Sequence, residues 1–309
     1  MRRLRRRRVS RAFILADCLA ALFIFALILP AALSLWRTAS FELRLCRDRA
    51  VAQRRAECVA AILVAPVFYC GMGMAAGAEG YKRGFNNRLA TPFSWNGPLS
   101  ILPTYDKRPE GLLRVAFGFP ESARLKNEAR GVESKAELTF DAPPVLNYLD
   151  LSLFDKGSSV KNWLLFAGCR KRTPFCALAA NGAKLTVKNY AAKDFYLPKG
   201  DRIVHFRALE VFSRDGKLYT NDFRTAGEQP RENGVCDIRF RVRDDMRALT
   251  VYILIRGDDA SLANGAAAVR RVENWPPEYR VAYNEYPYPL YSFQYSWPLL
   301  NLARAAGEK

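Results

Sequence analysis

A single histidine limits the chemistry that this chain of 309 residues can carry out. His205 lies in the sequence RIVHFR at residues 202–207, whose β-branched and aromatic side chains predict a strand. One imidazole excludes a metal site that needs two, and it leaves one candidate base for a serine or cysteine nucleophile. We interpret His205 as a surface or hydrogen-bonded strand residue. We expect no metal and no cofactor, and we favour a role other than catalysis while leaving an enzyme open.

Four aromatic residues near the C-terminus alternate with small polar residues. They are Tyr291, Phe293, Tyr295 and Trp297. In a strand this spacing puts all four rings on one face. Such a face can stack on sugars or bases, lie at a membrane interface, or simply form the strand's part of the core. We take the four residues as candidate binding residues.

Three arginines alternate in the same way over residues 239–243. Arg239, Arg241 and Arg243 would share one face of a strand, and Arg247 follows closely. A basic strand face can bind phosphate or an acidic polymer, or it can be a solvated outer face that prevents edge pairing. These arginines are the second set of candidate binding residues. Nucleic acid is a less favoured partner, because it would require this face to be exposed in the cytoplasm.

Seven cysteines are present, and two lie close together. Cys169 and Cys176 flank a basic turn that contains Pro174, and a disulfide between them is a candidate in an oxidising compartment. Two reduced thiols in a hairpin remain the alternative. Because no Cys-x-x-Cys pair occurs, zinc and thioredoxin-type redox sites have no support.

Ser100 begins the sequence Ser-Ile-Leu-Pro-Thr at residues 100–104. This segment resembles the Ser-Met-x-Pro-Thr box of type I signal peptidases, with isoleucine where that family has methionine. The resemblance implies that Ser100 would be the nucleophile, with a neutral, partly desolvated lysine as its base.

The resemblance covers five residues and supplies no base. The family's Lys-Arg-Val-x-Gly-x-Pro-Gly-Asp box has only the fragment RVAFGFP at residues 114–120, and Leu113 stands where the family has lysine. The family's Gly-Asp-Asn-Arg box has at best a counterpart at residues 257–259. A serine peptidase of this kind is the alternative function.

Two apolar stretches near the N-terminus are long enough to cross a bilayer. Residues 12–36 carry one charge, Asp17, and residues 58–78 carry none. At 1.5 Å per residue they would span roughly 37 Å and 31 Å, against a hydrocarbon core of about 30 Å. Small-x-small triplets that end at Ser34 and Ala78 also suit signal cleavage. Two spans, one anchor and a released domain are all open, and we favour two transmembrane helices.

Arginine is abundant on both sides of the first stretch and contributes to the net charge of +18. Seven arginines precede it and six lie in residues 37–57. The positive-inside rule favours the cytoplasmic side for both groups, which two crossing helices do not permit. A strand-rich domain on a short anchor with a close cysteine pair is typical of the outside. We therefore expect an inner (plasma) membrane protein with its soluble domain outside the cytoplasm.

The remaining chain has the pattern of a mainly-β soluble domain. A Gly/Pro/Asn-rich connector is expected at residues 80–110, after a membrane segment at residues 1–79, and strand signals then recur through residues 111–309. Asp215-Gly216 suits a tight hairpin turn. Helical stretches are expected only near residues 121–130, 260–271 and 299–306. Short strands with hairpin turns predict a β-sandwich or a barrel-like fold.

These features predict a membrane-anchored binding or assembly protein of the cell envelope. Its partners would be membrane lipid together with a neighbouring envelope protein or a glycan, since a basic chain attracts anionic surfaces. Oligomeric state and the side of the membrane on which the domain lies are left open.

Overall fold

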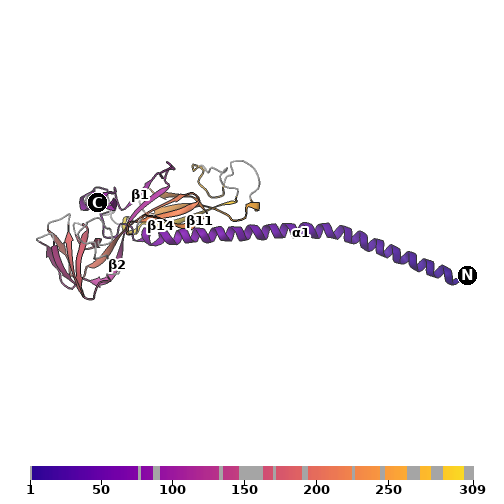
Figure 1. Ribbon diagram of the computed structural model, residues 1–309, viewed down its shortest axis with the longest axis horizontal. Coiled ribbons are helices and arrows are strands. Elements are labelled where there is room, and N and C mark those ends of the chain that lie inside the picture. The colour runs from indigo at the N-terminus through magenta and orange to yellow at the C-terminus, as the bar shows by residue number, and fades with distance from the viewer. Residues whose placement is uncertain are drawn as a thin grey trace.

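One long helix leads out of a β-rich body (Figure 1). The computed structural model describes residues 2–75, 78–85, 91–131, 135–145, 163–169, 172–189, 194–224, 227–243, 248–262, 272–279 and 288–302. Helix α1 runs without interruption over Arg2–Phe68. At 1.5 Å per residue it is about 100 Å long. Its N-terminal end lies far from the body (Figure 1).

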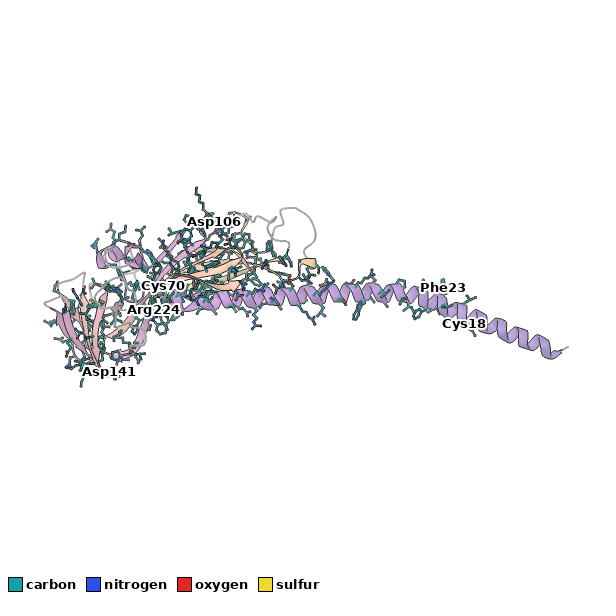
Figure 2. All side chains as sticks on the ribbon, in the orientation of Figure 1. Cys18, Phe23, Cys70, Asp106, Asp141 and Arg224 are labelled. Atoms are coloured by element: carbon teal, nitrogen blue, oxygen red, sulfur yellow. The ribbon has the colours of Figure 1, made fainter. Side chains whose placement is uncertain are left out.

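The two halves of α1 have different surroundings. In residues 17–47, which we call the exposed half, no side chain is buried. Cys18 and Phe23 project from this half, far from the body, whereas Cys70 lies within it (Figure 2). In residues 48–68, which we call the body-facing half, buried residues recur at helical spacing. These buried residues include Asp48, Ala52, Ala56, Val59, Leu63 and Val67.

The remaining named elements are short helices and antiparallel strands. The helices are α2 (Ala78–Gly84), η1 (Thr91–Ser94) and η4 (Ala260–Leu262). The strands are β1 (Leu99–Leu102), β2 (Leu112–Arg124), β3 (Ala129–Gly131), β4 (Lys135–Thr139), β5 (Trp163–Phe166), β6 (Phe175–Asn181), β7 (Lys184–Asn189), β8 (Phe195–Leu197), β9 (Arg202–Arg214), β10 (Lys217–Asp222), β11 (Glu228–Asn233), β12 (Val235–Val242), β13 (Ala248–Arg256) and β14 (Leu290–Pro298).

The largest sheet is a curled half-barrel. Its strand order is β1-β2-β9-β5-β6-β7-β4, with β10 paired to β9 and β11 paired to β10. Strands β2 and β9 pair antiparallel over most of their length. The predicted hairpin turn is confirmed, because Asp215 and Gly216 join β9 to β10 with φ of 51° and 68°. Positive φ at both central residues is the requirement of a type I′ turn.

The body-facing half of α1 packs between this sheet and a second one. The second sheet has the order β12-β13-β14. Val59 and Leu63 from α1 share one core cluster with Val115 of β2 and with Val251 and Ile253 of β13. A separate cluster lies chiefly among strands β4 to β8, with Ala123 of β2 and Ile203 of β9. The helix is therefore an integral part of the central core.

The structure has one helix where the sequence predicts two membrane-crossing helices. By length and composition, α1 is the one helix among the described residues that is long and apolar enough to cross a membrane. Within residues 58–78, helix α1 ends at Phe68, and the described chain then turns into the body. There Cys70 forms an isolated β-bridge with Phe117, and Met74 is buried. This stretch is apolar because it contributes to the core, so the prediction of a second crossing helix is wrong.

Other expectations have mixed outcomes. The mainly-β body is confirmed. The helix predicted at residues 121–130 is wrong, because β2 continues to Arg124 and β3 begins at Ala129. The expected helix at residues 260–271 is described only as η4, and residues 263–271 and 303–306 lie outside the described chain. The division at residues 79 and 110 stays a prediction, although Val59 and Ile101 pack into the same central cluster.

Candidate binding surface

The four aromatic residues of β14 lie over α1. Tyr291, Phe293, Tyr295 and Trp297 are half-buried and pack at the margin of the central cluster. Each pairs with a buried aliphatic residue of β13, for example Tyr295 with Val251. The rings therefore contribute to the core and keep part of their surface accessible, and their role in binding stays a prediction.

A buried carboxylate fixes β14 and the end of β13 to the helix. Asp48 of α1 is 4% exposed. Its Oδ2 accepts a hydrogen bond from the Tyr291 hydroxyl at 3.0 Å, and its Oδ1 accepts the backbone N–H groups of Asp258 and Asp259 at 2.6 Å and 3.0 Å. A Cβ on Gly257 would lie 1.8 Å from Asp48 Oδ2, so only glycine fits there. Burial, followed by the hydrogen bond to Asp48, raises the pKa of Tyr291.

Two rings of β14 and two polar residues of α1 form a surface that we call the α1–β14 ledge. It consists of Gln53, Glu57, Tyr295 and Trp297. The rings of Tyr295 and Trp297 stack with centroids 5.8 Å apart and planes at 5°. The Gln53 amide donates to Glu57 Oε1 at 3.0 Å. Burial and then the nearby Glu57 charge raise the pKa of Tyr295, so a carboxylate and an amide lie beside an aromatic pair.

The arginine stripe of β12 is not a continuous basic face. Arg239 is only 2% exposed, and its guanidinium binds Asp237 Oδ2 at 2.9 Å through Nε and 2.7 Å through Nη2. It also donates to the Pro109 carbonyl and lies over the Tyr279 ring at 5.1 Å. The Arg108 guanidinium approaches Asp237 Oδ1 at 3.2 Å. The prediction of Arg239 as a surface-binding residue is wrong, because Asp237 two residues earlier lies on the same strand face and pairs with it.

The other two arginines of the stripe lie further out. Arg241 is exposed and binds Glu278 at 2.5 Å and the Tyr279 hydroxyl at 3.2 Å. Arg243 is exposed just after β12. Arg247 lies outside the described residues. The exposed positive charge of this strand is therefore smaller than its sequence indicates.

Cys169 and Cys176 are free thiols that lie on opposite faces of the large sheet. Cys176 pairs with Trp163 in register and belongs to the cluster of Leu165, whereas Cys169 packs with Leu164 and Phe166. Because side chains alternate across a strand, the two clusters lie on opposite faces of the sheet. A disulfide therefore cannot join the thiol in one cluster to the thiol in the other. The predicted disulfide is not formed. Burial raises the pKa of Cys176 to about 11, which keeps it protonated at neutral pH.

Ser100 and His205 do not meet. Ser100 is half-buried in β1 and pairs with Arg114 of β2, and no hydrogen bond to a lysine is seen for it among the described residues. His205 is buried in β9, where its Nε2 lies 2.8 Å from Glu121 Oε2. Burial lowers the pKa of His205, and the Glu121 hydrogen bond opposes that change. The interpretation of His205 as a hydrogen-bonded strand residue agrees with this geometry.

Sequence reasoning missed Asp48, whose carboxylate accepts hydrogen bonds from Tyr291 of β14 and from the segment that follows β13. A signal was present, because Asp48 precedes Ala52, Ala56, Val59 and Leu63 at helical spacing on one apolar face. Because arginines lie on both sides of Asp48 in the sequence, the apolar face that follows it was not recognised.

Comparison of this chain with models of known protein families, with curated proteins and with solved structures finds no match.

Proposed function

We propose that this protein is anchored in a bilayer by the exposed half of α1 and holds its β-rich body at a fixed distance from the membrane to bind an envelope partner. The supporting observation is the contrast along α1. The apolar residues of α1 from Leu19 to Trp36 are exposed, whereas Ala52, Ala56, Val59, Leu63 and Val67 after Asp48 are in the core. Large contiguous apolar surfaces on a protein mark sites of membrane or protein contact.

The end of the apolar stretch has the composition of a membrane interface. Trp36 and Phe41 lie beside Arg37 and Arg44, and these four residues line a shallow hollow together with Thr38 and Ser40. Tryptophan is enriched at the headgroup level, and arginine binds phosphate there. Lipid headgroups are the partner that this hollow fits. From Trp36 to Asp48 the helix then rises about 18 Å before it enters the body.

Anchoring, rather than release of the body, is favoured by what cleavage would remove. A cut after Ala78 would remove Val59, Leu63 and Val67, all fully buried in the central cluster. Only the earlier site near Ser34 leaves that core intact.

A single crossing also changes the arginine balance. Seven arginines precede the span, whereas only Arg37, Arg44 and Arg47 lie between the span and Asp48, where the body-facing half of α1 begins. The positive-inside rule then favours a cytoplasmic N-terminus and a body outside the cytoplasm. An inner-membrane location of this orientation is the one we propose.

The α1–β14 ledge is the surface that we propose for the partner. A stacked aromatic pair beside a carboxylate and an amide has the chemistry of sugar binding, in which rings stack on the sugar face and polar groups bind hydroxyls. Nucleic acid is disfavoured, because Arg239 is internally paired. A glycan of the envelope is therefore the proposed ligand class, with a neighbouring envelope protein as the alternative.

Anchoring and orientation are tested together on the full chain. A reporter enzyme that works only outside the cytoplasm should be active when it is fused after Lys309. Extraction with alkaline carbonate should leave the protein in the membrane. Ile24→Arg, at the centre of the apolar stretch, should weaken insertion by about 2.5–3.5 kcal/mol, whereas Val51→Arg, at an exposed position beyond the stretch and the hollow, should not. Carbonate release of the unchanged protein, or a mature form that begins near residue 34, would overturn the anchor.

Ligand binding is tested with the detergent-solubilised full chain and insoluble β-linked polysaccharide as the probe. Trp297→Ala should reduce retention at least about fivefold, in line with about 1 kcal/mol or more for an aromatic stack. Tyr105→Ala is a control, because Tyr105 is an exposed ring away from the ledge. Equal retention of both variants would exclude the ledge as the glycan site.

A further inference from the structure

The exposed half of α1 carries a stripe of residues with alternating spacings of four and three. We call this stripe the seam. It consists of Cys18, Leu22, Phe25, Leu29, Ala32, Trp36, Ala39, Leu43, Cys46 and Ala50. All ten side chains are exposed. A repeat of four and three averages 3.5 residues, which is the period that two helices need to wind around each other.

The repeat is informative where the helix leaves the apolar stretch. Residues 37–50 contain eight polar or charged residues, yet the seam positions Ala39, Leu43, Cys46 and Ala50 are all apolar or weakly polar. Leu43 is 53% exposed. Most helical stability in proteins comes from packing of an apolar face. In residues 37–47 the body contacts α1 through the Arg44 hydrogen bond to Ser261, which leaves the seam positions open to a covering partner.

The seam lies on the side of α1 away from its own body. Ala50 is exposed, whereas Ala52 is fully buried. Two residues along a helix correspond to a rotation of about 200°. The body therefore leaves the seam open, and two bodies paired through their helices would point outward in opposite directions.

We infer that the seam binds a second copy of this chain, in parallel and in register. The inference rests on the proposed function in one respect, because copies inserted into one membrane with one orientation can only be parallel. A parallel pair also brings Glu42 of one copy opposite Arg47 of the other, since flanking positions five residues apart face each other in a two-stranded coil. This pairing of opposite charges occurs twice by symmetry.

The same geometry sets the end of the seam. The next flanking pair would be Arg49 with Arg54 of the other copy, and like charges repel. The next seam positions are Gln53 and Glu57, which belong to the α1–β14 ledge. The helices therefore separate after Ala50, and each copy keeps its ledge free.

The native cysteines provide the test. Three cysteines are exposed, all on α1, and the other four are buried. Cys18 and Cys46 are seam positions, whereas Cys58 lies about 120° around the helix from Cys46. In native membranes that contain the full chain, a variant with Cys46 as its one exposed cysteine (C18S/C58S) is oxidised with copper phenanthroline. The matched control keeps only Cys58 (C18S/C46S).

The Cys46 variant should form a covalent dimer, with at least about tenfold more product than the Cys58 variant, because seam side chains of a parallel coil lie in direct contact. Equal yields from the two variants, no dimer from Cys46, or a mixed product with another protein would overturn the inference. Carbonate extraction of the same membranes separates the two proposals. A chain that stays in the membrane without dimer contradicts the pairing alone, and a released chain contradicts the anchor.

Surface substitutions give a second readout that does not depend on thiol chemistry at the seam. Leu43→Glu should abolish the Cys46 dimer, whereas Val51→Glu, at an exposed position that is off the seam and outside the hollow, should leave it unchanged. Glu42→Arg should lower the yield a few-fold, and the double variant E42R/R47E should restore it, because the double exchange restores opposite charges. Failure of this restoration together with insensitivity to Leu43→Glu would exclude the parallel register.

Discussion

Both halves of α1 contain an apolar stretch, and the two stretches have opposite environments. The exposed half leaves side chains such as Phe25 and Leu29 exposed, whereas Val59 and Leu63 in the body-facing half are completely buried. An apolar stretch that is buried inside the chain stabilises the fold, and one that remains exposed needs another medium or another molecule. Hydropathy identifies both stretches and does not distinguish them.

The largest expected difference between the halves concerns core packing. Leu63→Ala removes a fully buried side chain and should lower the free energy of unfolding of the body by about 2–5 kcal/mol. Leu29→Ala, in the exposed half, should change it by less than about 0.5 kcal/mol. Denaturant titration of the full chain in detergent, followed by near-UV circular dichroism, measures both. Equal effects would show that α1 is not part of the core.

The boundary between the halves should depend on Asp48. Asp48→Ala leaves two backbone N–H groups and the Tyr291 hydroxyl without their acceptor, which should cost about 1–3 kcal/mol for buried donors. The same titration measures this loss. Glu42→Ala, at an exposed position six residues earlier, is the matched control and should be nearly neutral. A neutral Asp48→Ala would contradict the role of this carboxylate in joining helix and sheet.

Acid should also act on the body and not on the exposed half. Burial lowers the pKa of His205 in the folded body, and the charges of Arg224 and Arg207 also lower it. The hydrogen bond to Glu121 of β2 opposes this change. The unfolded chain therefore binds more protons just below pH 6.5, so this contribution to stability is complete above that pH and is lost as the pH falls. The denaturation midpoint should decrease between pH 7 and pH 5.

His205→Gln is the control for this pH effect. Glutamine can still donate to Glu121 but does not titrate, so the slope between pH 7 and pH 5 should become smaller. An unchanged slope would assign the acid sensitivity to other groups. Membrane retention, which depends on the exposed half, should be the same at both pH values.

The smallest expected effect on the body comes from a break in the exposed half. Thr38→Pro should disrupt α1 locally, because proline removes a helix hydrogen bond and clashes with the preceding turn. The free energy of unfolding of the body should nevertheless stay within about 0.5 kcal/mol of that of the unchanged chain. Loss of body stability would mean that the two halves are coupled more strongly than their contacts indicate.

Local patterns predicted much of the body and few of its long-range pairings. Alternation at residues 184–188 and 238–243 predicted strands that lie within β7 and largely within β12, and Asp215-Gly216 predicted a hairpin, because these features depend on neighbouring residues. The burial of Arg239 depends on Asp237 and on Arg108, which is far away in sequence. The second apolar stretch was misassigned because period and composition do not show which surface covers a helix.

The candidate binding residues also have features that local spacing predicts and features that depend on long-range contacts. The shared face of Tyr291, Phe293, Tyr295 and Trp297 followed from strand spacing alone, and the structure has it. That this face would lie over α1 could not be predicted, because Asp48 and Tyr291 are 243 positions apart.

That separation has a consequence for biosynthesis. At about 5–20 residues per second, a ribosome needs roughly 10–50 s after it makes Asp48 before Tyr291 emerges to meet it. Throughout this interval Val59 and Leu63 lack the β13–β14 side of their final environment. A nascent chain of this kind depends on protection from aggregation, so its yield in cells should be sensitive to chaperone capacity and translation speed.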